Sequence, residues 1–174
     1  DGMLYLALSS RGIDKIRGNG ATDPKIVRVD LEGGSYDLAQ AEQFGLLDQE
    51  AKKWRQWADW YVAGASFWGV DWPRAISYFE LLAKVAPGLS DGEGNYAITR
   101  YRQALTKYGD WLANQGKWCE AQEQYQKALE AGADPAVQPT ATYASEQCSP
   151  PSEATPQLPE DLTPTPTIEP SPTE

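Results

Sequence analysis

The chain has 174 residues, with 25 acidic and 15 basic side chains, no histidine and a formal net charge of −10. This length allows one domain. The acidic balance disfavours nucleic acid as a partner, because contacts to phosphates need a basic surface. No apolar run approaches the roughly 18 residues of a membrane-spanning helix, so we expect no membrane span. The chain begins at Asp1 with neither an initiator Met nor a signal peptide, which indicates a mature product or a fragment of a longer protein.

The segment 149–174 differs in composition from the rest of the chain. It holds eight Pro, five Thr, three Ser and five acidic residues, and it has no Lys or Arg. Such a segment cannot bury enough apolar surface to offset its ordering entropy, so we expect a disordered acidic tail. Residues 1–148 then form a mildly acidic globular part.

The pattern of residues 1–47 predicts N-terminal helices, with one stretch whose conformation stays open. Apolar residues recur at helical spacing over 3–17, and Gly18-Asn19-Gly20 ends that helix. Over 21–35 two interpretations stay open, because Asp23-Pro24 is a helix-start signal whereas 25–31 is rich in β-branched residues. The pair Gly33-Gly34 predicts a break, after which helical patterning resumes over 36–47.

Residues 50–87 predict two amphipathic helices. The first, 50–68, places five residues on one face: Trp54, Ala58, Tyr61, Ala65 and Trp68. The second follows Gly69, with Asp71 as a helix cap and Pro73 in the first turn, and it ends at Pro87-Gly88.

Residues 95–131 predict a second pair of helices, joined by the turn 114–117. Gly109 and Ala121 are small enough to let these helices approach closely. A closing helix over 135–148 follows from the start signal Asp134-Pro135, although Pro139 would delay its first residue to Gln138.

The two helix pairs resemble the tetratricopeptide (TPR) repeat, a helix–turn–helix unit with small and aromatic residues at set positions. The residues that carry the resemblance, and that it implies pack the repeats, are Tyr61, Gly69, Trp72, Ala75 and Phe79 in the first pair and Tyr108, Gly109, Gly116, Trp118, Ala121, Tyr125 and Ala128 in the second. Leu112 departs from the pattern, because an aromatic residue is usual there. The resemblance implies an all-α fold in which antiparallel helix hairpins form a right-handed repeat array with a C-terminal capping helix.

The resemblance also implies a peptide-binding groove lined by the first helix of each repeat. Its outward positions would be Gln56, Asp59, Ser66, Phe67, Gln103, Thr106, Asp110 and Asn114. This lining is polar and slightly acidic and lacks a Lys/Arg cluster, so it favours a basic or neutral peptide segment. The alternative is that these residues are ordinary solvated helix surface.

The two cysteines are candidates for a disulfide within this architecture. If consecutive helices pack antiparallel, Cys119 near the start of one lies beside Cys148 at the end of the next, and a bond would contribute roughly 3–4 kcal/mol. Two unrelated buried thiols are the alternative. A zinc site is disfavoured, because two Cys without His fall short of four ligands. A disulfide favours an oxidising compartment, and the Thr-Pro pairs of 163–167 resemble the stalks of exported bacterial proteins.

Other chemistry has weaker support in the sequence. The tryptophans most open to exposure, Trp57, Trp60 and Trp111, would suit glycan or cell-wall binding. Carboxylate pairs such as Asp30/Glu32 or Asp91/Glu93 lack a catalytic frame, and 91–95 lacks the spacing of a calcium loop.

The sequence therefore predicts a non-catalytic protein–protein interaction or scaffolding module of an exported or cell-surface protein, of bacterial type. We expect a protein or peptide partner, no cofactor and no metal. Self-association is left open. The alternative function is a glycan-binding or cell-wall-binding module that uses exposed Trp faces.

Overall fold

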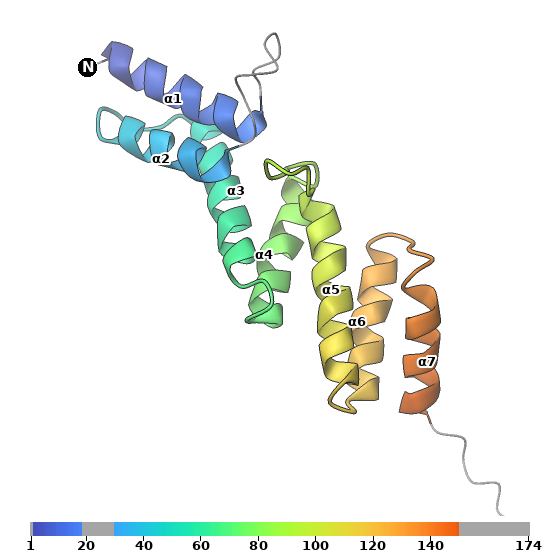
Figure 1. The fold of residues 1–174 in the computed structure, drawn as a ribbon. Coiled ribbons are helices and arrows are strands. Elements are labelled where there is room, and N and C mark those ends of the chain that lie inside the picture. The colour runs from blue at the N-terminus through green and yellow to red at the C-terminus, as the bar shows by residue number, and fades with distance from the viewer. Residues whose placement is uncertain (1, 19–29, 150–174) are drawn as a thin grey trace, which may run out of the picture.

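The computed structural model describes residues 2–18 and 30–149, which form seven α-helices and, apart from one isolated bridge between Ser90 and Tyr96, no β-structure. Each helix packs against the next one along the chain, and together they form an elongated array (Figure 1). The helices are α1 (Gly2–Arg17), α2 (Leu31–Glu42), α3 (Gln49–Ser66), α4 (Trp72–Val85), α5 (Ala97–Ala113), α6 (Trp118–Glu130) and α7 (Gln138–Cys148). The all-helical prediction is confirmed for the described residues.

Helices α1 and α2 cross at two glycines. A Cβ atom on Gly34 would lie 2.8 Å from the carbonyl oxygen of Gly12, and a Cβ atom on Gly12 would lie 2.9 Å from the carbonyl oxygen of Gly34. The predicted break at Gly33-Gly34 is therefore wrong, because both residues belong to α2. Asp30 caps the helix by accepting a hydrogen bond from the Gly33 backbone N–H. Gly34 has a low helix propensity, but its missing side chain allows α1 and α2 to pack closely.

A buried carboxylate strengthens the same pair of helices. Asp37 of α2 has a side chain only 5% exposed, and it pairs with Arg11 at 2.8 Å and with Lys15 at 2.9 Å, both on α1. Burial alone raises the pKa of Asp37, but the hydrogen bonds and positive charges of Arg11 and Lys15 outweigh it and hold the pKa below its ordinary value. The carboxylate is therefore charged and paired at neutral pH.

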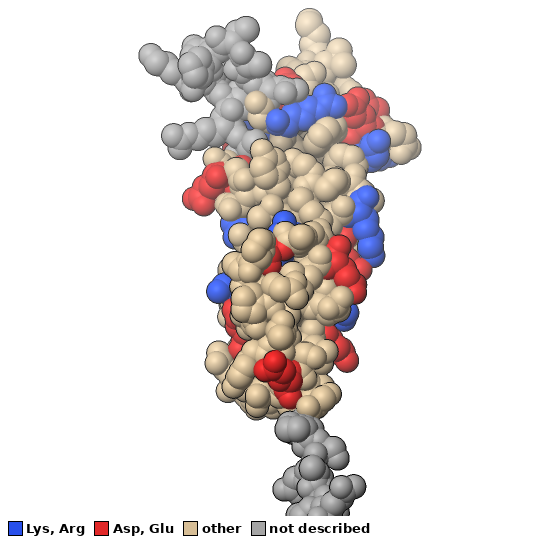
Figure 2. Space-filling view, turned by 90° about the vertical axis from the view of Figure 1, so that its right-hand side faces the viewer, with Lys and Arg blue, Asp and Glu red and all other residues tan. Residues whose placement is uncertain are grey.

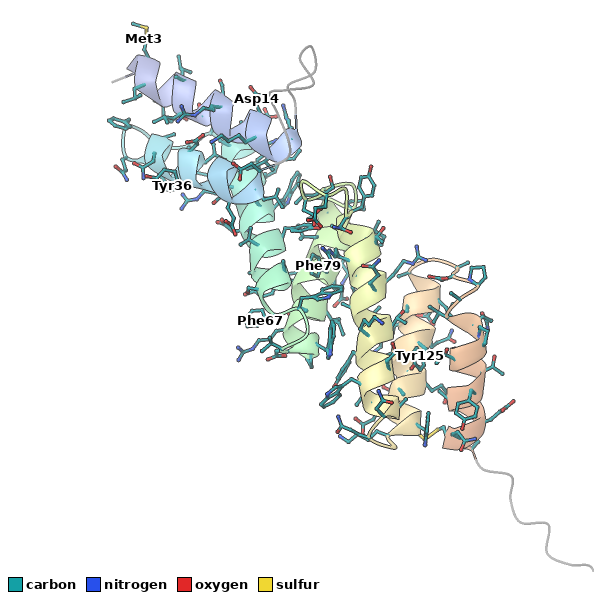
Figure 3. The ribbon with its side chains drawn as sticks, in the orientation of Figure 1. Met3, Asp14, Tyr36, Phe67, Phe79 and Tyr125 are labelled. Carbon is teal, nitrogen blue, oxygen red and sulfur yellow. A yellow bond between two sulfur atoms is a disulfide. The ribbon has the colours of Figure 1, made fainter. Side chains whose placement is uncertain are left out.

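Helices α3 and α4 both begin at a capping aspartate, of which only Asp71, the cap of α4, was predicted from the sequence. Asp48 accepts a hydrogen bond from the Ala51 N–H, and Asp71 accepts one from the Arg74 N–H. Between the two helices Phe79, labelled in Figure 3, lies edge-on to the ring of Tyr61 at 5.2 Å and has no exposed surface. Phe79 thus belongs to the larger hydrophobic core.

Helices α5, α6 and α7 share a second, smaller core. Tyr125 of α6 is 1% exposed, and a Cβ atom on Gly109 of α5 would lie 2.7 Å from its ring (Figure 3). Helix α7 begins at Gln138 and not at Pro135, because the chain first makes a turn in which the Val137 N–H donates to the carbonyl of Asp134. This is the later start that Pro139 indicates.

The predicted tail 150–174 and the ambiguous stretch 19–29 lie outside the described residues, so the structure does not test those predictions. Within the described ranges, none of the helices is long and apolar enough to cross a membrane.

Candidate functional site

A hollow of about 350 Å³ lies between α5, α6 and the segment that leads into α7. It is lined by Thr99, Arg102, Gln103, Thr106, Lys107, Asp110, Ala128, Asp134, Ala136, Val137 and Thr140. Gln103, Thr106 and Asp110, three of the eight predicted groove residues, are among them. They come together because they recur at intervals of three and four residues on one face of α5.

The charges around this hollow are balanced, whereas the sequence predicts a slightly acidic lining. Arg102 and Lys107 also line it, at positions that the groove prediction omits. Arg102 reaches toward Asp134 with an Nη2–Oδ2 distance of 3.5 Å, and Lys107 lies 3.6 Å from Asp110. The missed residues sit one position to either side of the predicted ones, where a helix wheel places the edge of the face.

Arg102 is the least satisfied charged group of the hollow. Its Nη2 atom lies 3.4 Å from the carbonyl oxygen of Ala133, a long hydrogen bond, and its Nε atom is buried without a partner among the described residues. A guanidinium has five N–H donors. Those on Nη1 make no hydrogen bond within the described residues and can serve a carbonyl or carboxylate that enters the hollow, whereas Nε is buried and Nη2 is engaged.

Asp110 ties the hollow to the core beneath it. The hydroxyl of Tyr125 donates a 2.9 Å hydrogen bond to the Asp110 carboxylate. Burial and the negative charge of Asp110 both raise the pKa of Tyr125 well above its usual range, so the phenol stays protonated. One oxygen of Asp110 is therefore fixed, which orients the carboxylate at the side of the hollow.

The other five predicted groove residues do not join this hollow. Gln56 and Asp59 line a separate hollow between α2 and α3, and Ser66 lines a third one beside Tyr61. The ring of Phe67 stacks on Tyr78 at 6.0 Å, while Asn114 is the C-terminal cap of α5. The outward faces of α3 and α5 are thus distinct surfaces.

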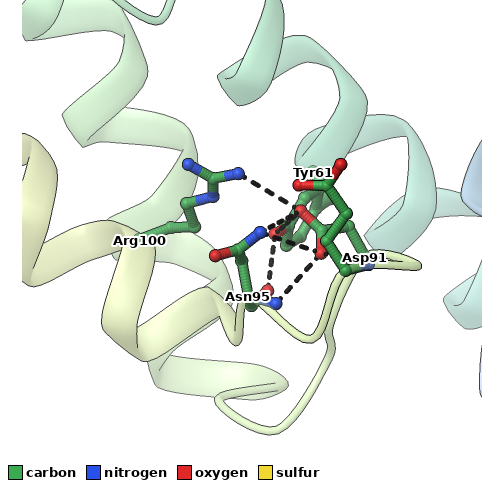
Figure 4. Close-up of polar contacts among 5 residues, drawn as sticks. Tyr61, Asp91, Asn95 and Arg100 are labelled. Atoms are coloured by element: carbon green, nitrogen blue, oxygen red, sulfur yellow. Dashed lines mark hydrogen bonds and ion pairs between the residues drawn. The ribbon is translucent and has the colours of Figure 1, made fainter.

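Asp91 is the centre of a polar cluster in the loop between α4 and α5 (Figure 4). Its carboxylate accepts hydrogen bonds from the backbone N–H groups of Glu93 and Asn95, both at 3.0 Å, and from Arg100 at 3.2 Å. The single proton of the Tyr61 hydroxyl is shared between the Asn95 carbonyl oxygen at 2.6 Å and the Asp91 carboxylate at 3.1 Å. Burial alone raises the pKa of Asp91, but the hydrogen bonds from the Asn95 backbone and side chain, from Arg100 and from the Glu93 backbone lower the pKa to about 2. The carboxylate is surrounded by donors, and it therefore anchors the loop to α3 and α5.

The aromatic side chains differ from the expectation for a glycan platform. Trp57 and Trp60 are half-buried and pack against the larger core, with Trp54 edge-on to Trp57 at 5.1 Å. These two rings, named from the sequence as open to exposure, are thus only partly exposed, since α3 contacts α2 as well as α4. Trp111 is 48% exposed, as the sequence indicates.

The sulfur atoms of Cys119 and Cys148 lie 2.01 Å apart, at disulfide distance, with their Cα atoms 4.7 Å apart. The start of α6 therefore lies beside the end of α7, which is the antiparallel arrangement that the pairing requires (Figure 1).

Uncharged residues cover most of the face drawn in Figure 2, and acidic and basic side chains are scattered mainly toward its margins. Comparisons of the chain with protein-family models, with curated proteins and with solved structures gave no match.

Proposed function

We propose that this chain is a non-catalytic protein–protein interaction module that binds a peptide segment of a partner protein in the hollow between α5, α6 and α7. The observation that carries the proposal is the convergence of Gln103, Thr106 and Asp110 with the incompletely paired Arg102 around one space. A peptide presents alternating carbonyl and N–H groups, and these side chains offer both donors and acceptors to them.

We also propose a TPR-like, right-handed repeat as the scaffold for this site. Equivalent residues of the two helix pairs have equivalent surroundings, which supports the alignment. Gly69 and Gly116 both have positive φ angles, 77° and 75°, in the turn between helices. Ala75 and Ala121 are both fully buried, and the aromatic residues Phe79 and Tyr125 each pack against a glycine of the preceding helix.

The balanced charge of the hollow favours a segment with little net charge. Arg102 and Lys107 are offset by Asp110 and Asp134 at 3.5–3.6 Å, so neither sign dominates. The free donors of Arg102 suit a backbone carbonyl, and the Gln103 amide suits either backbone group. A neutral peptide is therefore the ligand class we propose, with nucleic acid disfavoured by the net charge of −10.

An exported location fits this proposal. Disulfides persist in oxidising compartments and are rare in the cytosol, and Cys119 and Cys148 are at bonding distance. We therefore propose that the module acts outside the cytoplasm, where its partners are envelope or secreted proteins.

The direct test is a peptide display selection on the full chain, followed by affinity measurements on the enriched peptides. Gln103→Phe would fill the hollow from its exposed rim, whereas Gln126→Phe places the same ring on an exposed position of α6 outside it. We expect Gln103→Phe to weaken peptide binding at least tenfold and Gln126→Phe to leave it unchanged. Equal affinities for both variants would refute the site.

Glycan binding is the second candidate, and the exposed ring of Trp111 is the observation that favours it. Soluble cell-wall glycans that shift the tryptophan fluorescence, in a chain that selects no peptide, would establish this candidate over the first.

A further inference from the structure

An aromatic cleft of about 250 Å³ lies on the other side of α5, between that helix and the turn that joins α3 to α4. It is lined by Gly69, Val70, Asp71, Trp72, Pro73, Tyr108 and Trp111. The rings of Tyr108 and Trp111 stack with their centroids 5.8 Å apart and their planes at 25°. Val70 beside them is 83% exposed and Trp111 is 48% exposed, so the cleft presents apolar surface to solvent.

The polar groups of this cleft are few. Asp71 is its one acidic residue, and it is engaged as the cap of α4 and as the partner of Arg74 at 3.2 Å. The indole N–H groups of Trp72 and Trp111 donate no hydrogen bond to any residue in the described part of the chain. A neutral cleft with aromatic faces and free N–H donors is the surface on which polyproline II segments dock, because such segments expose proline rings and unpaired backbone carbonyls.

We propose that this cleft binds the segment Thr163–Pro172 of the same chain. Its first part, Thr-Pro-Thr-Pro-Thr-Ile over 163–168, carries no charge and matches the neutral lining. The alternation of Pro and Thr favours the polyproline II conformation, so little conformational entropy is lost when the segment binds. This proposal is independent of the peptide site between α5 and α7.

The connection between the two is long enough. Helix α7 ends at Cys148, beside Cys119 in the first turn of α6, and Trp111 is in the last turn of α5. The C-terminus of α7 and the α5–α6 turn lie at the same end of the array (Figure 1). Two interhelical spacings of 8–10 Å separate α7 from α5, roughly 20 Å. The 14 residues 149–162 span about 40 Å in polyproline II geometry.

The test compares amide resonances of Thr163, Thr165, Thr167 and Ser171 in the isotope-labelled full chain with those of a free peptide of residues 150–174. We expect the full chain to displace these resonances from the peptide positions, at all protein concentrations. Trp111→Ala should return them to the peptide positions. Trp60→Ala, the same truncation at a half-buried ring on α3, should leave them displaced.

A second variant guards against a folding defect in Trp111→Ala. The double substitution Pro164→Ala and Pro166→Ala leaves the cleft intact, and its resonances should coincide with those of a free 150–174 peptide that carries the same two substitutions. Coincident resonances in the unmodified chain would overturn the proposal. So would displacements that grow with concentration, which would assign the cleft to a second copy, or displacements that survive Trp111→Ala.

Discussion

The two ends of the helix array are held together in different ways. At the N-terminal end, α1 and α2 cross backbone to backbone at Gly12 and Gly34, and Asp37 adds a buried ion pair. At the C-terminal end, Ala144 is the sole buried residue of α7, and the Cys119–Cys148 pair joins α7 to α6.

This difference follows from the sizes of the two cores. Among the residues that the structure describes, thirteen buried ones form the cluster that spans α1 to the start of α5, whereas five form the cluster of α5, α6 and α7. A terminal helix with so little apolar burial needs another source of stability, because ordering its residues costs conformational entropy. A bond between Cys119 and Cys148, which lie at disulfide distance, would supply it at one end, while close packing suffices at the other.

Removing the cysteine pair should have the largest effect. We expect the double variant Cys119→Ala and Cys148→Ala to lose about 3–4 kcal/mol of unfolding free energy, the value for closing a loop of this length. Hydrogen exchange should show that protection falls in α7 and stays in α1. Before that, alkylation and mass measurement of the denatured, non-reduced chain should find no free thiol. Two labelled cysteines would contradict the pairing.

The second largest effect is expected from Asp91→Asn, because Asp91 anchors the loop between α4 and α5, where the larger core ends. Its folded-state pKa of about 2 lies below the ordinary 3.8. The stabilisation is therefore complete above the ordinary pKa and is lost as the pH falls from about 4 toward 2. Asp91→Asn should cost about 2 kcal/mol at neutral pH, since one pKa unit is 1.36 kcal/mol.

Chemical denaturation of this variant across the acidic range checks the sign. The unfolding free energies of the unmodified chain and of Asp91→Asn should converge as the pH approaches 2. Glu93→Gln, an exposed residue of the same loop, should behave like the unmodified chain at every pH. A constant gap between Asp91→Asn and the unmodified chain would contradict a charge-based role.

Gly34→Ala tests whether the close approach of α1 and α2 stabilises the N-terminal end. Helix propensity alone favours Ala by about 1 kcal/mol. The new Cβ atom, however, would lie 2.8 Å from a backbone oxygen that no rotamer change can move, and overpacking costs 1–3 kcal/mol. We expect a net loss of about 1–2 kcal/mol in thermal unfolding. Gly88→Ala is the matched control, because its Cβ atom would have no neighbour within 4 Å. A stabilised Gly34→Ala would show that the helices separate freely.

Helical periodicity and capping residues predict most of this fold. The predicted cap Asp71 lies before an apolar period of 3.6 residues, a local signal that tertiary packing does not override. Asp48 has the same position before α3, although it was not predicted as a cap. Gly33-Gly34 shows where local reasoning fails. By sequence alone the dipeptide is a turn signal, whereas in the structure it is the place where α2 crosses α1. Only the position of α1 in space distinguishes the two cases.

The candidate site was predictable in part for the same reason. The spacing of Gln103, Thr106 and Asp110 places them on one face of α5. Their partner Asp134 comes from the turn before α7, whose path depends on where that helix starts. Arg102 is a candidate ligand-binding residue because its guanidinium is incompletely hydrogen-bonded, and no sequence pattern encodes that property.

The smallest effect should come from Arg11→Gln, and it separates the two components of the N-terminal end. Arg11 is 58% exposed, and Lys15 remains 2.9 Å from Asp37 after the substitution, so the carboxylate keeps a cationic partner. We expect a fall in Tm smaller than that of Gly34→Ala. The double variant Arg11→Gln and Lys15→Gln leaves the buried carboxylate without a charge partner and should lower the Tm by more than the sum of the single variants. An additive result would mean that the glycine crossing alone holds α1 to α2.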